Sequence, residues 1–170
     1  MLIARKSLLL FSALGTCLLL SNCRADDKPT PPSTPAPKEI KTPKGVITRS
    51  YTVRGKRYRP MTVAQALEYS ETGEASLYGQ SGTRGAAGEI LKKGTYYAAH
   101  RTLPMPCTVK VTNVKNGRSI EARVIDRGPF HRSRIIDLSY AAGKALGISG
   151  IGQVKVEVIS VGKGEDVVTK

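Results

Sequence analysis

The sequence predicts a mainly β fold, a small barrel accompanied by one or two short helices. Short apolar segments recur between residues 74 and 160 and are broken by glycines, which is typical of short strands joined by tight turns. One stretch, residues 137–147, instead places its apolar residues at helical spacing. Short strands with one helix in so few residues favour a small barrel.

Five segments are the predicted strands: 74–79, 96–100, 108–114, 119–126 and 153–160. The third and fourth flank Asn116-Gly117. Because both of these residues tolerate positive φ, a hairpin is predicted there. A second short hairpin is indicated at Arg54-Gly55-Lys56, where the chain alternates in places between polar and apolar residues.

The main predicted helix spans residues 137–147, with Gly147 as its stop and Asp137 or Ser139 as its N-cap. Its apolar face comprises Leu138, Ala141, Ala142 and either Ala145 or Leu146. Residues 62–69 have the composition of one or two further helical turns.

The first 23 residues have the pattern of an export signal. Arg5 and Lys6 precede an uncharged run, residues 7–20, that is too short for a membrane-spanning helix. The run ends in a segment, residues 20–23, that resembles the bacterial lipoprotein cleavage box, although Asn22 stands where Gly or Ala is usual. Cys23 is then the predicted lipid-bearing first residue of the mature protein. Ordinary cleavage nearby, or an uncleaved anchor, are the alternatives.

The remainder of the chain divides by composition. Residues 24–45 contain six prolines between Pro29 and Pro43 and predict an extended tether. Residues 46–73 are an expected N-terminal extension that packs on the barrel, 74–160 are the barrel, and 161–170 are an expected disordered tail.

The three cysteines exclude a disulfide within the barrel. Cys17 lies in the signal and Cys23 at the cleavage box, so only Cys107 belongs to the folded part. A Cys23–Cys107 disulfide is possible only if Cys23 carries no lipid. The residues around Cys107 look like the start of a strand, which argues against a catalytic thiol.

The formal net charge is +14, and removal of Arg5 and Lys6 with the signal leaves +12. Such a surface attracts polyanions. Export and an aromatic content of only 5% argue against nucleic acid, so we expect acidic peptidoglycan as the partner, with solubility alone as the alternative explanation of the charge.

Asp126 is the strongest candidate for chemistry, because it ends an apolar strand. Partial burial raises a carboxyl pKa and lets the group hold a proton, as a general acid requires. Consecutive residues of a strand point to opposite faces, so Arg127 is expected to turn away and pair with Asp137 or Glu121. The alternative is that Asp126 only caps the turn through backbone amides.

Glu89 and His100 are the next candidates. Glu89, in a loop rich in Gly and Ala, is either an acid or a carboxylate that stabilises positive charge on a sugar, or else a solvated loop residue. His100 closes an apolar strand and either orients a carboxylate or is a satisfied half-buried residue. No ligand spacing joins these residues and His131 into a metal site, and no phosphate loop or dinucleotide motif is present, so we expect no metal and no cofactor.

Several motifs in order give the chain a resemblance to the rare lipoprotein A family: ASLYG, GAAGE, YAAHRTLP, VTNVKNGRSI, DRGPFHRSRIIDLSYAAGKALG and VKVEVI, across residues 48 to 160. The resemblance implies a six-stranded double-psi β-barrel and a lytic transglycosylase that acts on peptidoglycan, preferably on strands without stem peptides. It also implies functional roles for Glu89, His100 and Asp126. The residues expected to bind substrate are Tyr78, Arg127, His131 and Arg134.

This chain departs from the family at the groove. Leu77 replaces the usual tryptophan of ASWYG, and the loop at residues 80–88 is about two residues shorter, with Gly85 and Ala87 in place of Thr and Asn. A noncatalytic module that binds or loosens the wall is therefore the alternative function. We expect a monomer that is lipid-anchored in the cell envelope, on the periplasmic side of the outer membrane.

Overall fold

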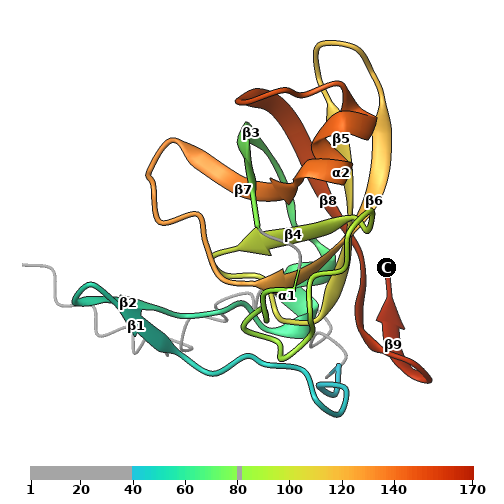
Figure 1. Ribbon diagram of the computed structural model, residues 1–170. Coiled ribbons are helices and arrows are strands. Elements are labelled where there is room, and N and C mark those ends of the chain that lie inside the picture. The colour runs from blue at the N-terminus through green and yellow to red at the C-terminus, as the bar shows by residue number, and fades with distance from the viewer. Residues whose placement is uncertain (1–39, 80–81) are drawn as a thin grey trace, which may run out of the picture. The chain divides into compact units, whose positions relative to one another are not determined.

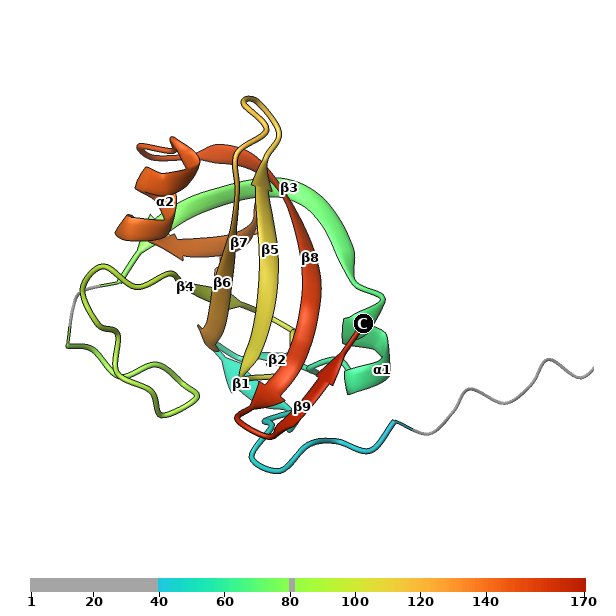
Figure 2. The ribbon, with the colours of Figure 1, turned by 90° about the vertical axis from the view of Figure 1, so that its right-hand side faces the viewer.

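Six strands close into a barrel. The computed structural model describes residues 40–79 and 82–170, so the signal, Cys23 and most of the tether lie outside the described residues. The barrel strands are β3 (Ser70–Tyr78), β4 (Tyr97–His100), β5 (Cys107–Asn113), β6 (Ser119–Asp126), β7 (Arg134–Ser139) and β8 (Gly152–Lys163). They are ordered β3-β7-β4-β6-β5-β8, and the pairing of β8 back to β3 closes the ring (Figure 2). The predicted six-stranded barrel is confirmed.

Both predicted hairpins form. β5 and β6 pair antiparallel around the turn with Gly117, whose φ is 72°. The strands β1 (Tyr51–Val53) and β2 (Lys56–Tyr58) pair across Arg54 and Gly55, which both have positive φ. The β1–β2 hairpin projects to one side of the barrel in Figure 1.

The predicted helix at residues 137–147 begins later than expected. Residues Arg134–Ser139 form strand β7, and helix α2 spans only Tyr140–Leu146. The apolar Ile-Ile-Asp-Leu run pairs with β3 on one side and β4 on the other, and this pairing favours a strand over a helical turn. Ser139, not Asp137, is the N-cap, and Gly147 ends the helix with φ 74°.

The segment before the barrel packs against it. Helix α1 (Val63–Leu67) has a capping box, in which Thr62 and Gln65 bond each other's backbone N–H groups. Its residues Val63, Ala66 and Leu67 are buried in the main core. Strand β3 starts at Ser70, so the barrel takes four residues that were expected in the extension.

Residues 161–170 are not the disordered tail that the sequence predicted. β8 runs to Lys163, and β9 (Asp166–Thr169) returns antiparallel to it. Gly162 and Gly164 have positive φ at this turn, which lets the chain reverse there. Val161 is fully buried and Val168 packs on the core, so apolar burial retains the segment.

Buried aliphatic residues fill the barrel. Cys107 is among them, with a free thiol that is fully inaccessible. Burial raises the pKa of this thiol to about 12, so no reactive thiolate forms at neutral pH.

Among the described residues, no helix is both long and apolar enough to span a membrane.

Candidate active site

Two aspartates lie in one row across the barrel wall. Ala99 of β4 is the register partner of Asp126 on β6 and of Asp137 on β7, and Ser76 of β3 pairs with Asp137 on the far side. Register partners carry their side chains on the same face of a sheet. The two carboxylates therefore share a face, and their strands are roughly 9–10 Å apart, two strand spacings.

Asp126 both caps a turn and faces a cavity. Its Oδ1 accepts the backbone N–H of Arg127 at 2.8 Å and that of Ala86 at 3.0 Å. The same side chain lines a cavity of about 390 Å³ together with Tyr78, Leu91 and other residues. The sequence left two alternatives for Asp126, a turn cap or a catalytic group, and in the structure its side chain both caps the turn and lines a cavity. The bond to Ala86 also fixes the 82–91 loop beside the carboxyl group.

The Arg127 guanidinium turns away from Asp126, as strand alternation predicts, but its expected partners are wrong. Its nitrogens donate to the carbonyls of Leu103 at 2.6 Å and Ile47 at 3.4 Å, and it lies 5.1 Å from the centre of the Tyr51 ring. Burial lowers the pKa of this guanidinium. Arg127 therefore anchors the neighbouring loops and leaves the Asp126 carboxyl without a side-chain ion pair to it.

Glu89 is held by two cations. Its carboxylate lies 3.2 Å from Arg123 and 3.4 Å from Lys163. Burial raises its pKa, but the hydrogen-bonded Arg123 and Lys163 outweigh burial, so the net shift is downward and the group is ionised. The side chain does not line the Asp126 cavity. The structure thus places Glu89 where it fastens its loop to β6 and β8.

His100 is buried, only 2% exposed, and fully engaged. Its Nδ1 accepts the backbone N–H groups of Thr102 at 3.1 Å and Leu103 at 2.9 Å. Because Nδ1 accepts, we assign the proton to Nε2, which lies 3.0 Å from the Tyr69 hydroxyl. Burial, then the nearby cations Arg101 and Arg127, lower its pKa to about 3. His100 is therefore a neutral residue that organises the turn after β4.

Tyr78 lines the Asp126 cavity, and both aspartates act on its hydroxyl electrostatically. Its hydroxyl is buried and has no hydrogen-bond partner among the described residues. Burial and the negative charges of Asp126 and Asp137 raise its pKa. An unpartnered buried hydroxyl is costly, and because this one is inaccessible, Tyr78 contributes to the cavity lining with other atoms of its side chain.

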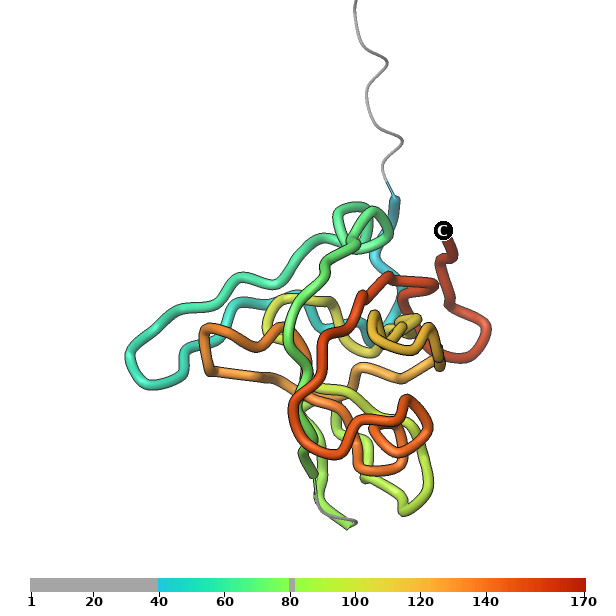
Figure 3. Tube along the Cα trace, turned by 90° about the horizontal axis from the view of Figure 1, so that it is seen from above, coloured from blue at the N-terminus to red at the C-terminus, as the bar shows by residue number. Residues whose placement is uncertain are grey.

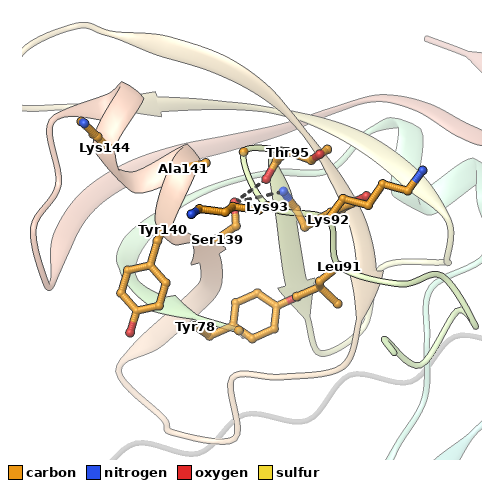
Figure 4. A pocket seen from close by; sticks show the side chains of 12 residues that line it. Tyr78, Leu91, Lys92, Lys93, Thr95, Ser139, Tyr140, Ala141 and Lys144 are labelled. Atoms are coloured by element: carbon orange, nitrogen blue, oxygen red, sulfur yellow. Dashed lines mark hydrogen bonds between the residues drawn. The ribbon is translucent and has the colours of Figure 1, made fainter. Parts of the chain in front are cut away.

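A second cavity of about 670 Å³ continues from the first, since Tyr78, Gly79, Leu91 and Tyr140 line both. Figure 4 shows Tyr78 and Tyr140 bordering this space. Tyr140 opens helix α2 and is 64% exposed, so its ring offers a flat apolar surface. The two cavities form one open groove with Asp126 near one end.

His131 and Arg134, predicted to bind substrate, lie outside this groove lining. His131 is exposed in the 127–133 loop, with Nδ1 3.0 Å from the Ser133 hydroxyl. Arg134 donates to the Ser76 hydroxyl at 2.7 Å and lies 3.7 Å from Asp137. In the described part of the chain, no three His, Cys, Asp or Glu side chains gather as a metal site would require.

The sequence interpretation placed Asp137 at the start of a helix and did not name Tyr140. Asp137 was assigned to a helix end, yet it is 9% exposed and accepts a bond from Ser76 at 2.6 Å. The available signal was an acidic residue inside an apolar Ile-Ile-Asp-Leu run, because a buried carboxylate requires polar partners. Tyr140 carried no such signal, because its exposure depends on where α2 begins.

Comparison with known proteins decides the family. The family model described as lytic transglycolase matches residues 70–158, which include all of β3 to β7. The chain belongs to the lytic transglycolase family. Its barrel is therefore the double-psi barrel, and the resemblance to rare lipoprotein A proteins is confirmed.

Curated relatives of this chain are named endolytic peptidoglycan transglycosylase RlpA. The Neisseria meningitidis serogroup A protein is 48% identical over 123 residues, covering 70% of this chain and 51% of its own length. The Vibrio cholerae protein is 47% identical over 119 residues, covering 68% and 44%. The chain thus spans about half the length of the curated relatives that it matches.

Among solved structures, an expansin of Clavibacter michiganensis is similar, with 20% identity and a TM-score of 0.45. The alignment covers 56% of this chain and 53% of the expansin.

The Leu77 departure from the family pattern falls behind the groove. Leu77 is half-buried and packs on the core, and a Cβ added to Gly143 of α2 would overlap it. Leu77 does not line either cavity of the groove. In this chain, the exposed aromatic surface of the groove comes from Tyr140 instead.

Proposed function

We propose that this chain is an endolytic transglycosylase that cleaves the β-1,4 bond between MurNAc and GlcNAc in peptidoglycan, preferably in strands without stem peptides. The observation that carries the proposal is Asp126, which lies in an open groove while the guanidinium of Arg127 is bonded elsewhere. Relatives at 47–48% identity are named endolytic peptidoglycan transglycosylases, which supports the proposal.

In the proposed mechanism, Asp126 protonates the leaving glycosidic oxygen as positive charge develops on the MurNAc ring. The C6 hydroxyl of the same sugar then attacks the anomeric carbon and closes a 1,6-anhydro ring. Its proton returns to Asp126, so one carboxyl serves first as acid and then as base. No attacking water is required.

Glu89 and His100 act in this proposal by positioning. Glu89 pairs with Arg123 and Lys163 and thereby fixes its loop to the barrel. The same loop contains Ala86, whose backbone N–H donates to the Asp126 carboxylate. His100 holds the turn that contains Leu103. The carbonyl of Leu103 accepts a hydrogen bond from the Arg127 guanidinium and so keeps it away from Asp126. Both residues thereby affect Asp126 from a distance, and Tyr78 lines the groove beside the bound sugar.

The cellular setting is also proposed. Lipid attachment at Cys23 would hold a monomeric barrel on the periplasmic side of the outer membrane, with the proline-rich segment 24–45 as the reach into the wall. Replacing Cys23 with Ala is expected to abolish incorporation of labelled palmitate.

The alternative is a noncatalytic wall-binding barrel, favoured by one observation: the side chains of Glu89 and His100 do not converge on Asp126 but bond elsewhere. The full-length chain should be incubated with peptide-free glycan strands and the products analysed by mass spectrometry. We expect 1,6-anhydro-ended fragments from within the strands. Retention on the strands without such fragments would support the binder.

Gly85 provides a test of loop geometry. A Cβ at this position would lie 2.7 Å from the backbone oxygen of Ile125, which cannot move freely within β6. Gly85→Ala should therefore displace the loop that bonds Asp126 and lower kcat by about 10- to 100-fold. Gly150→Ala, where the added Cβ meets nothing within 4 Å, is the matched control. Equal kcat values for the two variants would rule out this role of the loop.

A further inference from the structure

A separate basic hollow lies between strand β2 and the loop after β6. It has a volume of about 310 Å³ and is lined by five cations: Lys56, Arg57, Arg59, Arg101 and Arg132. No acidic residue lines it. Figure 3 shows the β1–β2 hairpin and the 127–133 loop extending on the same side of the barrel. We call this surface the basic hollow.

The cations of the basic hollow are not neutralised within the described part of the chain. The ion pairs there involve Arg123, Arg134, Lys155 and Lys163 instead. Arg101 donates only to the backbone carbonyl of His131, at 3.2 Å. Five like charges around one small hollow produce a local positive potential that an anionic ligand relieves.

Aromatic rings border these charges. Tyr51 and Tyr58 stack at 5.2 Å between ring centres, and Phe130 lies 5.5 Å from Tyr58. Phe130 is 41% exposed, and the Lys56 ammonium lies 5.3 Å from the Tyr58 ring centre. The surface thus combines apolar ring faces with cations, which suits a ligand that carries both apolar C–H surface and carboxylates.

The basic hollow lies within reach of a polymer bound at Asp126. Phe130 follows Asp126 by four residues, which limits their Cα separation to about 14 Å. Arg127, between them, lies over the Tyr51 ring and links the two places. A polymer cleaved at an internal bond extends on both sides of Asp126, so part of it can occupy the hollow.

We infer that the basic hollow is a second peptidoglycan-binding site, which holds carboxylates of the polymer outside the catalytic groove. The guanidinium of an arginine can bond both oxygens of one carboxylate at once. Three of the five cations of the basic hollow are exposed arginines: Arg57, Arg59 and Arg132. The inference rests on the proposed function only for the identity of the polymer. The carboxylates belong either to the lactyl groups of the sugars or to stem peptides.

The test measures binding in the Asp126→Asn background, so that the polymer stays intact. The full-length chain is sedimented with insoluble peptidoglycan and, separately, titrated with peptide-free strands at several salt concentrations. The triple change Arg57→Gln, Arg59→Gln and Arg132→Gln removes three exposed charges. The matched control, Lys110→Gln, Lys115→Gln and Arg118→Gln, removes three exposed charges from the β5–β6 hairpin.

The arginine triple should weaken binding about tenfold and make the remainder less sensitive to salt, whereas the control binds as the parent does. The lactyl carboxylate is free only where the stem peptide is absent, so loss on peptide-free strands alone assigns the lactyl groups and loss on intact peptidoglycan alone assigns the stem peptides. Loss on both polymers shows that the hollow takes carboxylates of either kind. The inference is overturned if the arginine triple binds both polymers as the parent does. This holds even if the same variant binds phosphatidylglycerol vesicles more weakly than the parent. Because cleavage is measured separately, failure of the proposed reaction leaves this result interpretable.

Discussion

Replacing Asp126 with asparagine is expected to lower the rate of 1,6-anhydro product formation by about 10²- to 10⁴-fold, because the amide cannot deliver a proton to the leaving oxygen. The fold should persist. The amide oxygen can still accept the N–H groups of Ala86 and Arg127, so the turn and the loop keep their bonds. The measurement is the initial rate on peptide-free strands, with the melting temperature as the check on folding.

Glu121→Gln is the matched control for this prediction. Glu121 is an exposed carboxylate on the same strand, β6, and its neutralisation should leave the rate within about twofold of the parent. If Asp126→Asn retains full activity while Glu89→Gln abolishes it, the acid is misassigned, and the ion-paired carboxylate would have to be the catalytic group.

The second large effect concerns stability and pH. His100 has a pKa near 6.5 when unfolded and about 3 in the folded barrel, where burial is the main cause. Between these values the unfolded chain binds more protons, so the free energy of unfolding should fall as pH drops from about 6.5 towards 3. Thermal unfolding at pH 7, 6 and 5 measures the slope.

His100→Asn should remove most of this slope. An asparagine oxygen lies near the place of Nδ1 and can accept one of the two amide bonds, but it does not titrate. His100→Ala, which leaves both amides without that acceptor, should lower the free energy of unfolding at pH 7 by about 2–4 kcal/mol. His131→Asn, at an exposed histidine, is the control and should keep the parental slope. An unchanged slope in His100→Asn would show that other groups cause the acid sensitivity.

The strands and hairpins could be predicted because their signals are local. Asn116-Gly117 and Arg54-Gly55 set the turns wherever the rest of the chain lies. Strand β7 could not be predicted this way, since its Ile-Ile-Asp-Leu run becomes a strand only by pairing with β3 and β4, which are distant in sequence. Tertiary pairing overrode the helical spacing of residues 137–139.

The site shows the same division. Strand alternation predicted that the Arg127 side chain points away from that of Asp126, because the face to which a strand residue points depends only on its place along the strand. Its partners, the carbonyls of Ile47 and Leu103, could not be predicted, because they belong to loops whose paths depend on the whole barrel. Likewise, the sequence offered Glu89 as a reactive carboxylate, and only the fold brings Arg123 and Lys163 to it.

The most direct test of the account is a crystal structure of the Asp126→Asn chain with a peptide-free glycan tetrasaccharide. The account predicts a MurNAc–GlcNAc oxygen within about 2.6–3.2 Å of the side chain at position 126, with a sugar beside Tyr78 in the groove. A strand bound along the barrel with every glycosidic oxygen beyond hydrogen-bond reach of that side chain would contradict it.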